Sequence, residues 1–114
     1  KFLEKESYKK AEKALKAYTK STPEDTDGWN LYAFTNRKLK NYDKAENYYQ
    51  KALELDPNNK SALEYQGELF VELGRLDEAN NNLEKLRMLC KEDCLEFQML
   101  ERYINSESEK LYKK

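Results

Sequence analysis

The two cysteines are the residues of this 114-residue chain whose type and spacing most directly suggest chemistry. Cys90 and Cys94 lie four residues apart in the stretch LCKEDC. If the chain bends between them, the two sulfur atoms can come within disulfide distance; otherwise they are two partly buried thiols at a helical corner. A bridge would require an oxidising compartment. The spacing alone leaves both alternatives open.

Composition excludes most catalytic and metal chemistry. The sequence contains no histidine, which rules out imidazole acid–base catalysis, a Ser–His–Asp triad and zinc sites with histidine ligands. Two cysteines cannot supply the four ligands of a zinc site within one chain, and the phosphate-binding patterns GxGxxG and GxxxxGK[ST] are absent. An enzyme that uses carboxylates alone, as glycosidases do, is the remaining catalytic alternative, but no cleft-forming architecture is apparent. We therefore predict a protein that is not an enzyme and has no catalytic residue, cofactor or metal site.

The overall charge and residue content favour a helical protein and argue against nucleic-acid and membrane partners. Charged residues make up 38% of the chain, with only three Gly and two Pro, as is typical of long helices. The 21 Lys and Arg nearly balance the 22 Asp and Glu, which argues against a nucleic-acid partner. Most of the nine tyrosines fall at expected packing positions rather than in a base-stacking surface. No apolar run approaches the ~20 residues of a membrane span, so no direct membrane insertion is expected.

An internal repeat organises the chain. The segments 8–25, 42–59 and 76–93 follow one another at a constant interval. Small residues match in register at Ala11, Ala45 and Ala79. Further apolar residues match four and seven positions later, at Leu15, Tyr49 and Leu83, and at Tyr18, Ala52 and Leu86. The interval, a period of about 34 residues, is that of an array of helix–turn–helix units.

Helical geometry explains the spacing within each repeat. Residues three and four apart share one face of a helix, so Ala45, Tyr49 and Ala52 form a stripe that packs against a partner helix. Pro57 ends that helix, and Asn58 or Asn59 can cap the next one. The pattern predicts helices over residues 11–20, 26–39, 43–55, 60–73 and 77–90, and a further helix from about residue 94.

These residues resemble the tetratricopeptide repeat family, whose pattern is W-x2-L-G-x2-Y, then A-x3-F, then P. In the 26–59 copy the matching positions are Trp29, Tyr32, Ala33, Asn36, Ala45, Tyr49 and Pro57. In the 60–93 copy they are Leu63, Gln66, Gly67, Phe70, Ala79 and Leu83. Gln66 departs most from the family, because it occupies a position that is normally apolar. The resemblance implies an all-α fold, an alpha-alpha superhelix with a C-terminal capping helix.

The resemblance also divides the chain. We expect a partial N-terminal repeat over residues 1–25, mostly its second helix, with residues 1–5 as the last turn of its first helix. Full repeats follow at 26–59 and 60–93, and residues 94–114 form the capping helix and tail. Phe97, Leu100 and Ile104 share the face of that helix expected to point inward.

In this family the first helix of each pair lines a concave groove, which suggests a module that binds a peptide or helix segment of another protein. The residues expected to face this groove are Asn30, Phe34, Arg37, Glu64, Tyr65, Glu68 and Val71. Family members that act as co-chaperones hold a terminal carboxylate with cationic residues on such positions. Glu64 and Glu68 would repel an acidic tail, so a basic or mixed-charge peptide fits better. The alternative is a structural element that forms a homo-oligomer through its incomplete N-terminal repeat, where Leu15 and Tyr18 would meet another copy.

A narrower resemblance bears on the compartment. The stretches RKLKNYDKA, ALEYQGELF and LRMLCKEDCLEF are similar to those of small exported bacterial tetratricopeptide proteins that carry a Cys pair before the last helix. This resemblance implies a periplasmic or otherwise exported protein with a Cys90–Cys94 disulfide. A cytoplasmic protein is the alternative.

Overall fold

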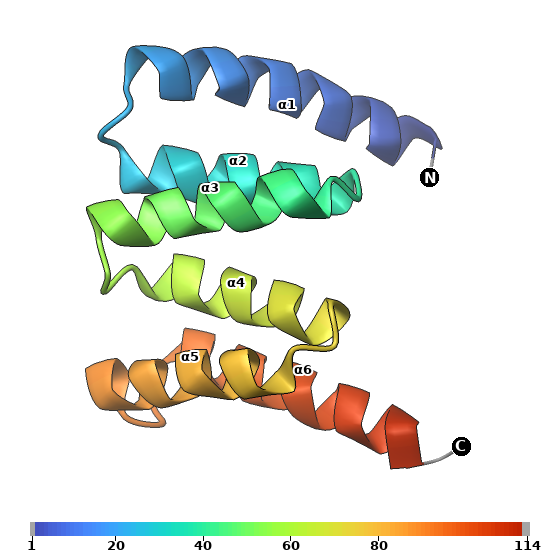
Figure 1. The fold of residues 1–114 in the computed structure, drawn as a ribbon, viewed down its shortest axis with the longest axis vertical. Coiled ribbons are helices and arrows are strands. Elements are labelled where there is room, and N and C mark those ends of the chain that lie inside the picture. The colour runs from blue at the N-terminus through green and yellow to red at the C-terminus, as the bar shows by residue number, and fades with distance from the viewer. Residues whose placement is uncertain (1, 113–114) are drawn as a thin grey trace. The chain divides into compact units, whose positions relative to one another are not determined.

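The structure of the protein, a computed structural model, describes residues 2–112, and within them it contains helices and no strand (Figure 1). The helices are α1 (Phe2–Ser21), α2 (Thr26–Lys38), α3 (Tyr42–Leu55), α4 (Lys60–Glu72), α5 (Leu76–Cys90) and α6 (Leu95–Tyr112). The chain divides into two compact units, residues 1–62 and 63–114, and the division falls inside α4. The all-α fold class predicted from the repeat is confirmed. No helix in the described part of the chain is both long and apolar enough to cross a membrane.

Two helices end in the same way, at equivalent positions of successive repeats. After α2, the N–H of Lys40 donates to the Arg37 carbonyl and that of Asn41 to the Asn36 carbonyl, at 2.9 and 2.8 Å. After α4, the N–H groups of Gly74 and Arg75 donate to the carbonyls of Val71 and Phe70, at 3.0 and 2.8 Å. These paired bonds form a Schellman motif, which turns the chain through a residue with positive φ. That residue is Lys40 (φ 66°) in one copy and Gly74 (φ 77°) in the next.

In the first unit, α2 packs against both α1 and α3. Ala33 of α2 and Ala45, Tyr49 and Ala52 of α3 have no exposed surface, as the predicted stripe requires. Small side chains at these positions let the helices approach closely, and the large Tyr49 ring fills the space beside them. Tyr32 stacks on Tyr48, with ring centroids 4.1 Å apart and an interplanar angle of 11°.

The core of the second unit is formed by α5, α6 and the part of α4 that follows residue 62. The three residues of α6 that were predicted to face inward, Phe97, Leu100 and Ile104, are buried. Leu100 lies against Gly67 so closely that a Cβ added there would stand 2.6 Å from the Leu100 Cδ2 atom. Gln66 occupies a position that is normally apolar, but its amide oxygen has a hydrogen-bond partner: Oε1 accepts a 2.8 Å hydrogen bond from Asn82 Nδ2.

The N-terminal helix differs from the expectation. A helix was predicted over residues 11–20, with residues 1–5 as the last turn of a preceding helix, but α1 runs without interruption from Phe2 to Ser21. The segment contains neither Gly nor Pro, and no residue in it interrupts the backbone ladder. The other helix boundaries agree with the prediction to within two residues.

Candidate functional site

The start of α2 is fixed by Asp25. This residue has extended backbone angles (φ −86°, ψ 104°), and its Oδ1 accepts a 3.0 Å hydrogen bond from the Asp27 N–H, which makes it the N-cap of α2. Its Oδ2 accepts a 2.5 Å hydrogen bond from the Tyr18 hydroxyl of α1. This bond lowers the pKa of Asp25 and raises the pKa of Tyr18. The first helix of the repeat is therefore held in place by a charged cap.

A second polar cluster joins the starts of α2 and α4. Asn59 Nδ2 donates to Thr26 Oγ1 and Asp27 Oδ1 at 3.0 and 3.1 Å, while its Oδ1 accepts from the Ala62 N–H at 3.1 Å. Asn59 is thus the cap of α4, one of the two candidates that the sequence offered. The hydrogen bonds from Asn59 to α2 were not predicted, because they depend on which part of the preceding repeat lies next to Asn59 in the folded chain.

On α2 the predicted groove residues differ in burial. Asn30 is buried, and its Nδ2 donates a 3.0 Å hydrogen bond to the Oγ of Ser61. Arg37 is also buried, whereas Phe34 is half-buried, with the Lys38 ammonium 5.4 Å from its ring centroid. The sequence placed these residues on one helical face but could not give their individual exposure.

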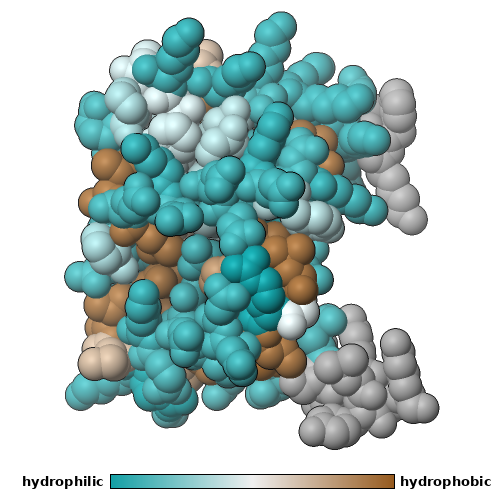
Figure 2. Space-filling view, in the orientation of Figure 1, coloured by the Kyte–Doolittle hydropathy of each residue, from teal (hydrophilic) through white to brown (hydrophobic). Residues whose placement is uncertain are grey.

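On α4, Glu64 and Val71 are buried, with 2% and 7% of their surface exposed, while Tyr65 and Glu68 are half-buried. The structure does not test whether any of these residues contacts a peptide, and the groove assignment stays a prediction. Figure 2 shows one face of the molecule, where hydrophilic side chains predominate and apolar groups lie between them.

Asn30 and Glu64 share a feature that the sequence did not reveal. They occupy equivalent positions in successive repeats. Both are buried, and among the described residues neither Asn30 Oδ1 nor Glu64 Oε2 has a hydrogen-bond partner. A buried acceptor without a partner is destabilising, so two at one repeat position call for an explanation. In each unit, a hydrogen-bond donor that reached the acceptor would satisfy it.

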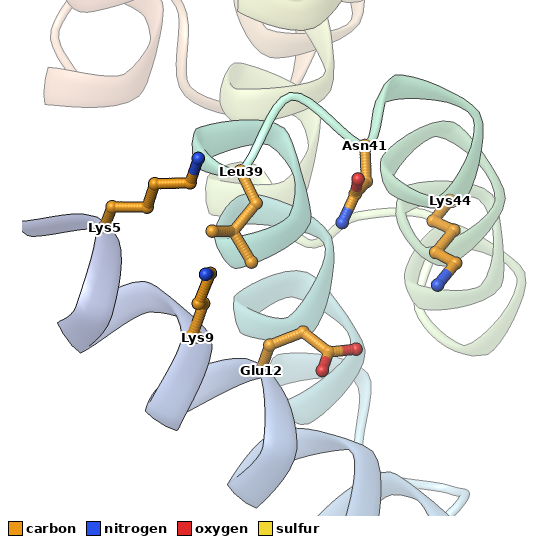
Figure 3. A pocket seen from close by; sticks show the side chains of 6 residues that line it. All are labelled: Lys5, Lys9, Glu12, Leu39, Asn41 and Lys44. Carbon is orange, nitrogen blue, oxygen red and sulfur yellow. The ribbon is translucent and has the colours of Figure 1, made fainter.

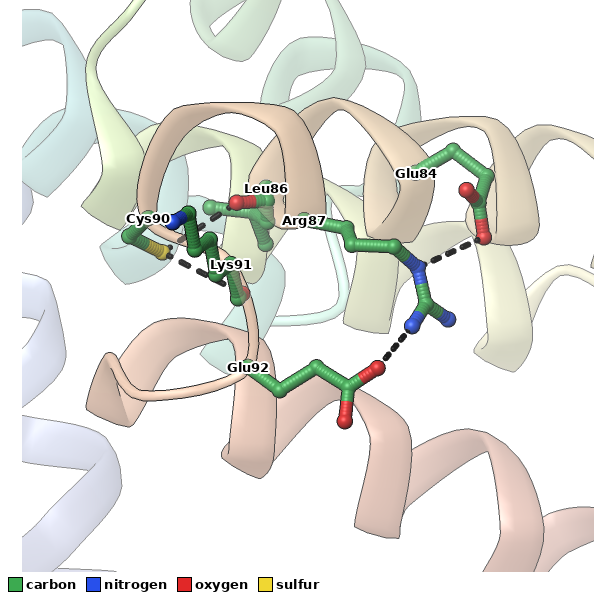
Figure 4. A network of polar contacts seen from close by, with 6 residues as sticks. All are labelled: Glu84, Leu86, Arg87, Cys90, Lys91 and Glu92. Atoms are coloured by element: carbon green, nitrogen blue, oxygen red, sulfur yellow. Dashed lines mark hydrogen bonds and ion pairs between the residues drawn. The ribbon is translucent and has the colours of Figure 1, made fainter.

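The α5–α6 corner holds the cysteine pair. The structure joins Cys90 to Cys94, whose Cα atoms lie 5.7 Å apart, within the range that a disulfide requires. The Arg87 guanidinium in the same corner donates hydrogen bonds to Glu84, at 3.3 Å, and to Glu92 (Figure 4). It also lies 4.9 Å from the Phe97 ring centroid. Two large apolar side chains beside the bridge, Met88 and Leu95, are 86% and 61% exposed.

These features define a repeat protein built from paired helices, with the first helix of each pair carrying the candidate binding residues. Comparison with known families gives the particular class: residues 26–59 and residues 48–79 each match a model described as Tetratricopeptide repeat. Residues 26–79 are therefore similar to tetratricopeptide repeats, as the sequence pattern suggested. Such repeats are generally protein–protein interaction modules, and typically non-catalytic scaffolds. No curated protein matches the chain.

Proposed function

We propose that the chain binds other proteins, and that the α2 face of the first unit and the α4 face of the second unit each accept a partner segment that brings hydrogen-bond donors. The observation that carries the proposal is that each face holds a buried acceptor without a partner among the described residues, Asn30 Oδ1 on α2 and Glu64 Oε2 on α4. Backbone N–H groups, Lys and Arg are the donors that a polypeptide offers. A carboxylate acceptor forms a stronger bond to a cationic donor than an amide does, which favours a basic or mixed-charge segment.

Phe34, Tyr65 and Glu68 supply the more accessible part of the proposed contact surface. All three are half-buried, so each still offers surface to a ligand. Aromatic side chains provide a large contact area at a small cost in side-chain entropy, which suits recognition of an extended peptide.

The test is affinity selection from a peptide library that contains basic, acidic and mixed-charge sequences. We expect sequences with Lys or Arg to be enriched. Against a selected peptide, the Glu64→Gln variant should bind about tenfold more weakly, since one charge-assisted hydrogen bond is lost. The control is Glu54→Gln, which removes the same charge from an exposed position on α3 and should leave affinity unchanged.

Stability measurements separate a binding defect from misfolding. Because Glu64 is a buried carboxylate with an unsatisfied oxygen, Glu64→Gln should leave the free protein at least as stable as the wild type in urea unfolding. If no peptide is selected, or if Glu54→Gln weakens binding as much as Glu64→Gln, the proposed function is wrong.

Self-assembly is the second candidate function, and the exposed surface of α1 is what favours it. Ala14 and Ala17 are exposed there, and small side chains permit close contact between helices. Tyr18, expected to meet another copy, is instead hydrogen-bonded to Asp25 within the chain. Light scattering over a concentration series tests this function, since a strict monomer at high concentration excludes it.

We also propose that the protein works in an oxidising compartment outside the cytoplasm, such as the bacterial periplasm. The 5.7 Å Cα separation of Cys90 and Cys94 supports a bridge, and such bridges persist mainly in oxidising compartments. Protein isolated in the presence of a thiol alkylating agent should show no added mass at either cysteine. Complete alkylation of both would contradict the proposal.

A further inference from the structure

A hollow in the first unit is lined mainly by lysine side chains. It has a volume of about 350 Å³ and lies beside the turn between α2 and α3 (Figure 3). Lys5, Lys9 and Glu12 come from α1, Leu39 and Asn41 from the turn, and Lys44 from α3. We call these six residues the basic hollow. None of them belongs to the α2 and α4 faces proposed above.

The positive charge of the basic hollow is poorly compensated. Within the described part of the chain, neither Lys5 nor Lys44 forms an ion pair, and Lys9 pairs only with Glu6, with the charged atoms 3.8 Å apart. The one acidic residue in the lining, Glu12, already accepts a 3.1 Å hydrogen bond from the Tyr32 hydroxyl. The hollow therefore presents three ammonium groups with little local neutralisation.

Two neighbouring hollows share residues with the basic hollow and enlarge the positively charged surface. One shares Lys5 and Leu39 with the basic hollow and adds Lys38 and Lys40, and the other shares Asn41 and Lys44. Among the residues that the structure describes, Glu4 and Asp43 are the only acidic ones lining them. Five lysines thus surround a continuous stretch of concave surface that has three carboxylates.

The α2–α3 turn beside these lysines is held by hydrogen bonds. Asn41 Nδ2 donates a 3.1 Å hydrogen bond to Oδ1 of the fully buried Asn36, and the Asn41 N–H donates to the Asn36 carbonyl at 2.8 Å. The turn is therefore anchored to the core of the unit. A ligand that met this surface would not have to order the backbone first, which favours binding.

We propose that the basic hollow binds an acidic segment of a partner protein. Carboxylate side chains complement the ammonium groups, and the half-buried Leu39 offers an apolar contact between them. The interspersed carboxylates argue against nucleic acid, because a phosphate backbone carries charge at every nucleotide and would pass close to Glu12 or Asp43. Occupation of this surface is independent of the peptide-binding function proposed for α2 and α4.

The experiment measures fluorescence anisotropy of a labelled short peptide that alternates glutamate with leucine and glycine. Its control replaces every glutamate with glutamine, and a single-stranded oligonucleotide of equal charge is the competing probe. Three lysines are replaced in the test variant, Lys5→Gln, Lys9→Gln and Lys44→Gln. The matched control variant is Lys13→Gln, Lys16→Gln and Lys20→Gln, which removes the same charge from exposed positions of α1 outside the hollow.

At about 0.15 M salt we expect the acidic peptide to bind and the glutamine peptide not to bind, since distant charges are screened there while close pairs persist. The test variant should bind about tenfold more weakly, from the loss of three partly exposed pairs, and the control variant less than about twofold more weakly. Circular dichroism melting checks that both variants fold. Equal weakening by the two variants, no binding of the acidic peptide, or tighter binding of the oligonucleotide would each overturn the proposal.

Discussion

At the residue scale, Lys40 has a backbone conformation that lysine rarely adopts. Its φ of 66° places it at the position of the Schellman motif that Gly74 occupies in the next repeat. A left-handed conformation costs a non-glycine residue about 1–2 kcal/mol, partly offset because glycine gains more freedom in the unfolded chain. Lys40→Gly should therefore raise the free energy of unfolding by about 0.5–1 kcal/mol in urea titration.

The reciprocal change is the control for Lys40. Gly74→Ala introduces a Cβ where no atom lies within 4 Å, so any effect arises from the positive φ alone. It should lower the free energy of unfolding by about 1 kcal/mol. A destabilising Lys40→Gly would mean that the lysine side chain contributes more than its backbone conformation costs.

The ionisation of Asp25 contributes to the stability of the chain at acid pH. The Tyr18 hydroxyl holds the pKa of this carboxyl below its usual value. A group with a lowered pKa in the folded state stabilises the protein above its unfolded pKa, and that contribution is lost as pH falls through the folded pKa. Asp25→Asn keeps a capping oxygen but removes the charge, so it should be less stable than the wild type near neutral pH and approach the wild type below about pH 4, where the carboxyl is protonated.

Asp25→Ala provides the comparison, because alanine removes the cap itself. It should lower the free energy of unfolding by about 1 kcal/mol at neutral pH. Urea unfolding of the two variants at several pH values distinguishes the cap from the charge. Identical pH profiles for Asp25→Asn and the wild type would show that another carboxylate dominates the acid transition.

At the element scale, substitutions at Gly67 and Gly28 test how closely two helix contacts are packed. A Cβ at Gly67 would meet the Cδ atoms of the fully buried Leu100 at 2.6 and 2.7 Å. A Cβ at Gly28 would meet the Tyr18 ring at 2.7 Å, but Tyr18 is 41% exposed and can shift outward at the expense of its hydrogen bond to Asp25. Gly67→Ala should therefore cost about 1–3 kcal/mol, because a packed core resists added volume.

Gly28→Ala should be close to neutral, since the propensity of alanine for helices, worth about 1 kcal/mol, offsets the shift of the tyrosine. Thermal unfolding followed by circular dichroism gives both values. If the two variants melt at the same temperature, α6 does not pack against residue 67 as tightly as the structure indicates.

Reduction of the disulfide at the α5–α6 corner should lower the stability of the protein. The Cys90–Cys94 bridge closes a short loop with a sequence separation of four, for which chain entropy predicts a stabilisation of at most about 2 kcal/mol. A reducing agent should lower the free energy of unfolding by up to this amount in the wild type. It should have no effect on Cys94→Ser, which cannot form the bridge. Equal behaviour of the two proteins would show that the cysteines are not joined.

The elements also show how far sequence reasoning extends. The repeat spacing predicted α2 to α6 because the stripe Ala45, Tyr49 and Ala52 fixes which face is buried, and Pro57 fixes where α3 ends. The repeat alignment was wrong at α1, where it predicted the end of one helix and the start of another, although no Gly or Pro in the segment interrupts the helix. It also could not give the burial of Glu64 or the bond between Asn30 and Ser61, because these depend on neighbours in the folded chain.

At the scale of the whole molecule, near-zero net charge conceals an uneven distribution. Residues 1–62 contain 13 Lys and Arg against 10 Asp and Glu, whereas residues 63–114 contain 8 against 12. The first unit is thus net positive and the second net negative, although the chain as a whole carries only −1. Each unit suits a partner segment of opposite charge, which is consistent with the acidic ligand proposed for the basic hollow and the donor-rich ligand proposed for Glu64.

The lack of histidine determines how the whole chain responds to pH. Histidine is the one side chain whose ordinary pKa lies between about 5 and 8, and bridged cysteines do not titrate. Stability should be lost only outside this window. On the acid side the lowered pKa values of Asp25 and Glu78 contribute, the latter caused by its hydrogen bond from Arg75. On the alkaline side Tyr32 contributes, because burial and its contact with Tyr48 raise its pKa.

We therefore expect the free energy of unfolding to change by less than about 0.5 kcal/mol between pH 6 and pH 8. It should fall as pH rises above about 10, because a tyrosine whose pKa is raised in the folded state stops stabilising the protein there. Urea titrations at constant ionic strength across this range provide the measurement, with Tyr32→Phe as the variant that should retain more stability at alkaline pH. A change larger than about 1.4 kcal/mol between pH 6 and pH 8 would require a proton to bind one state and not the other. Since the chain has no histidine to bind that proton, such a change would contradict the prediction.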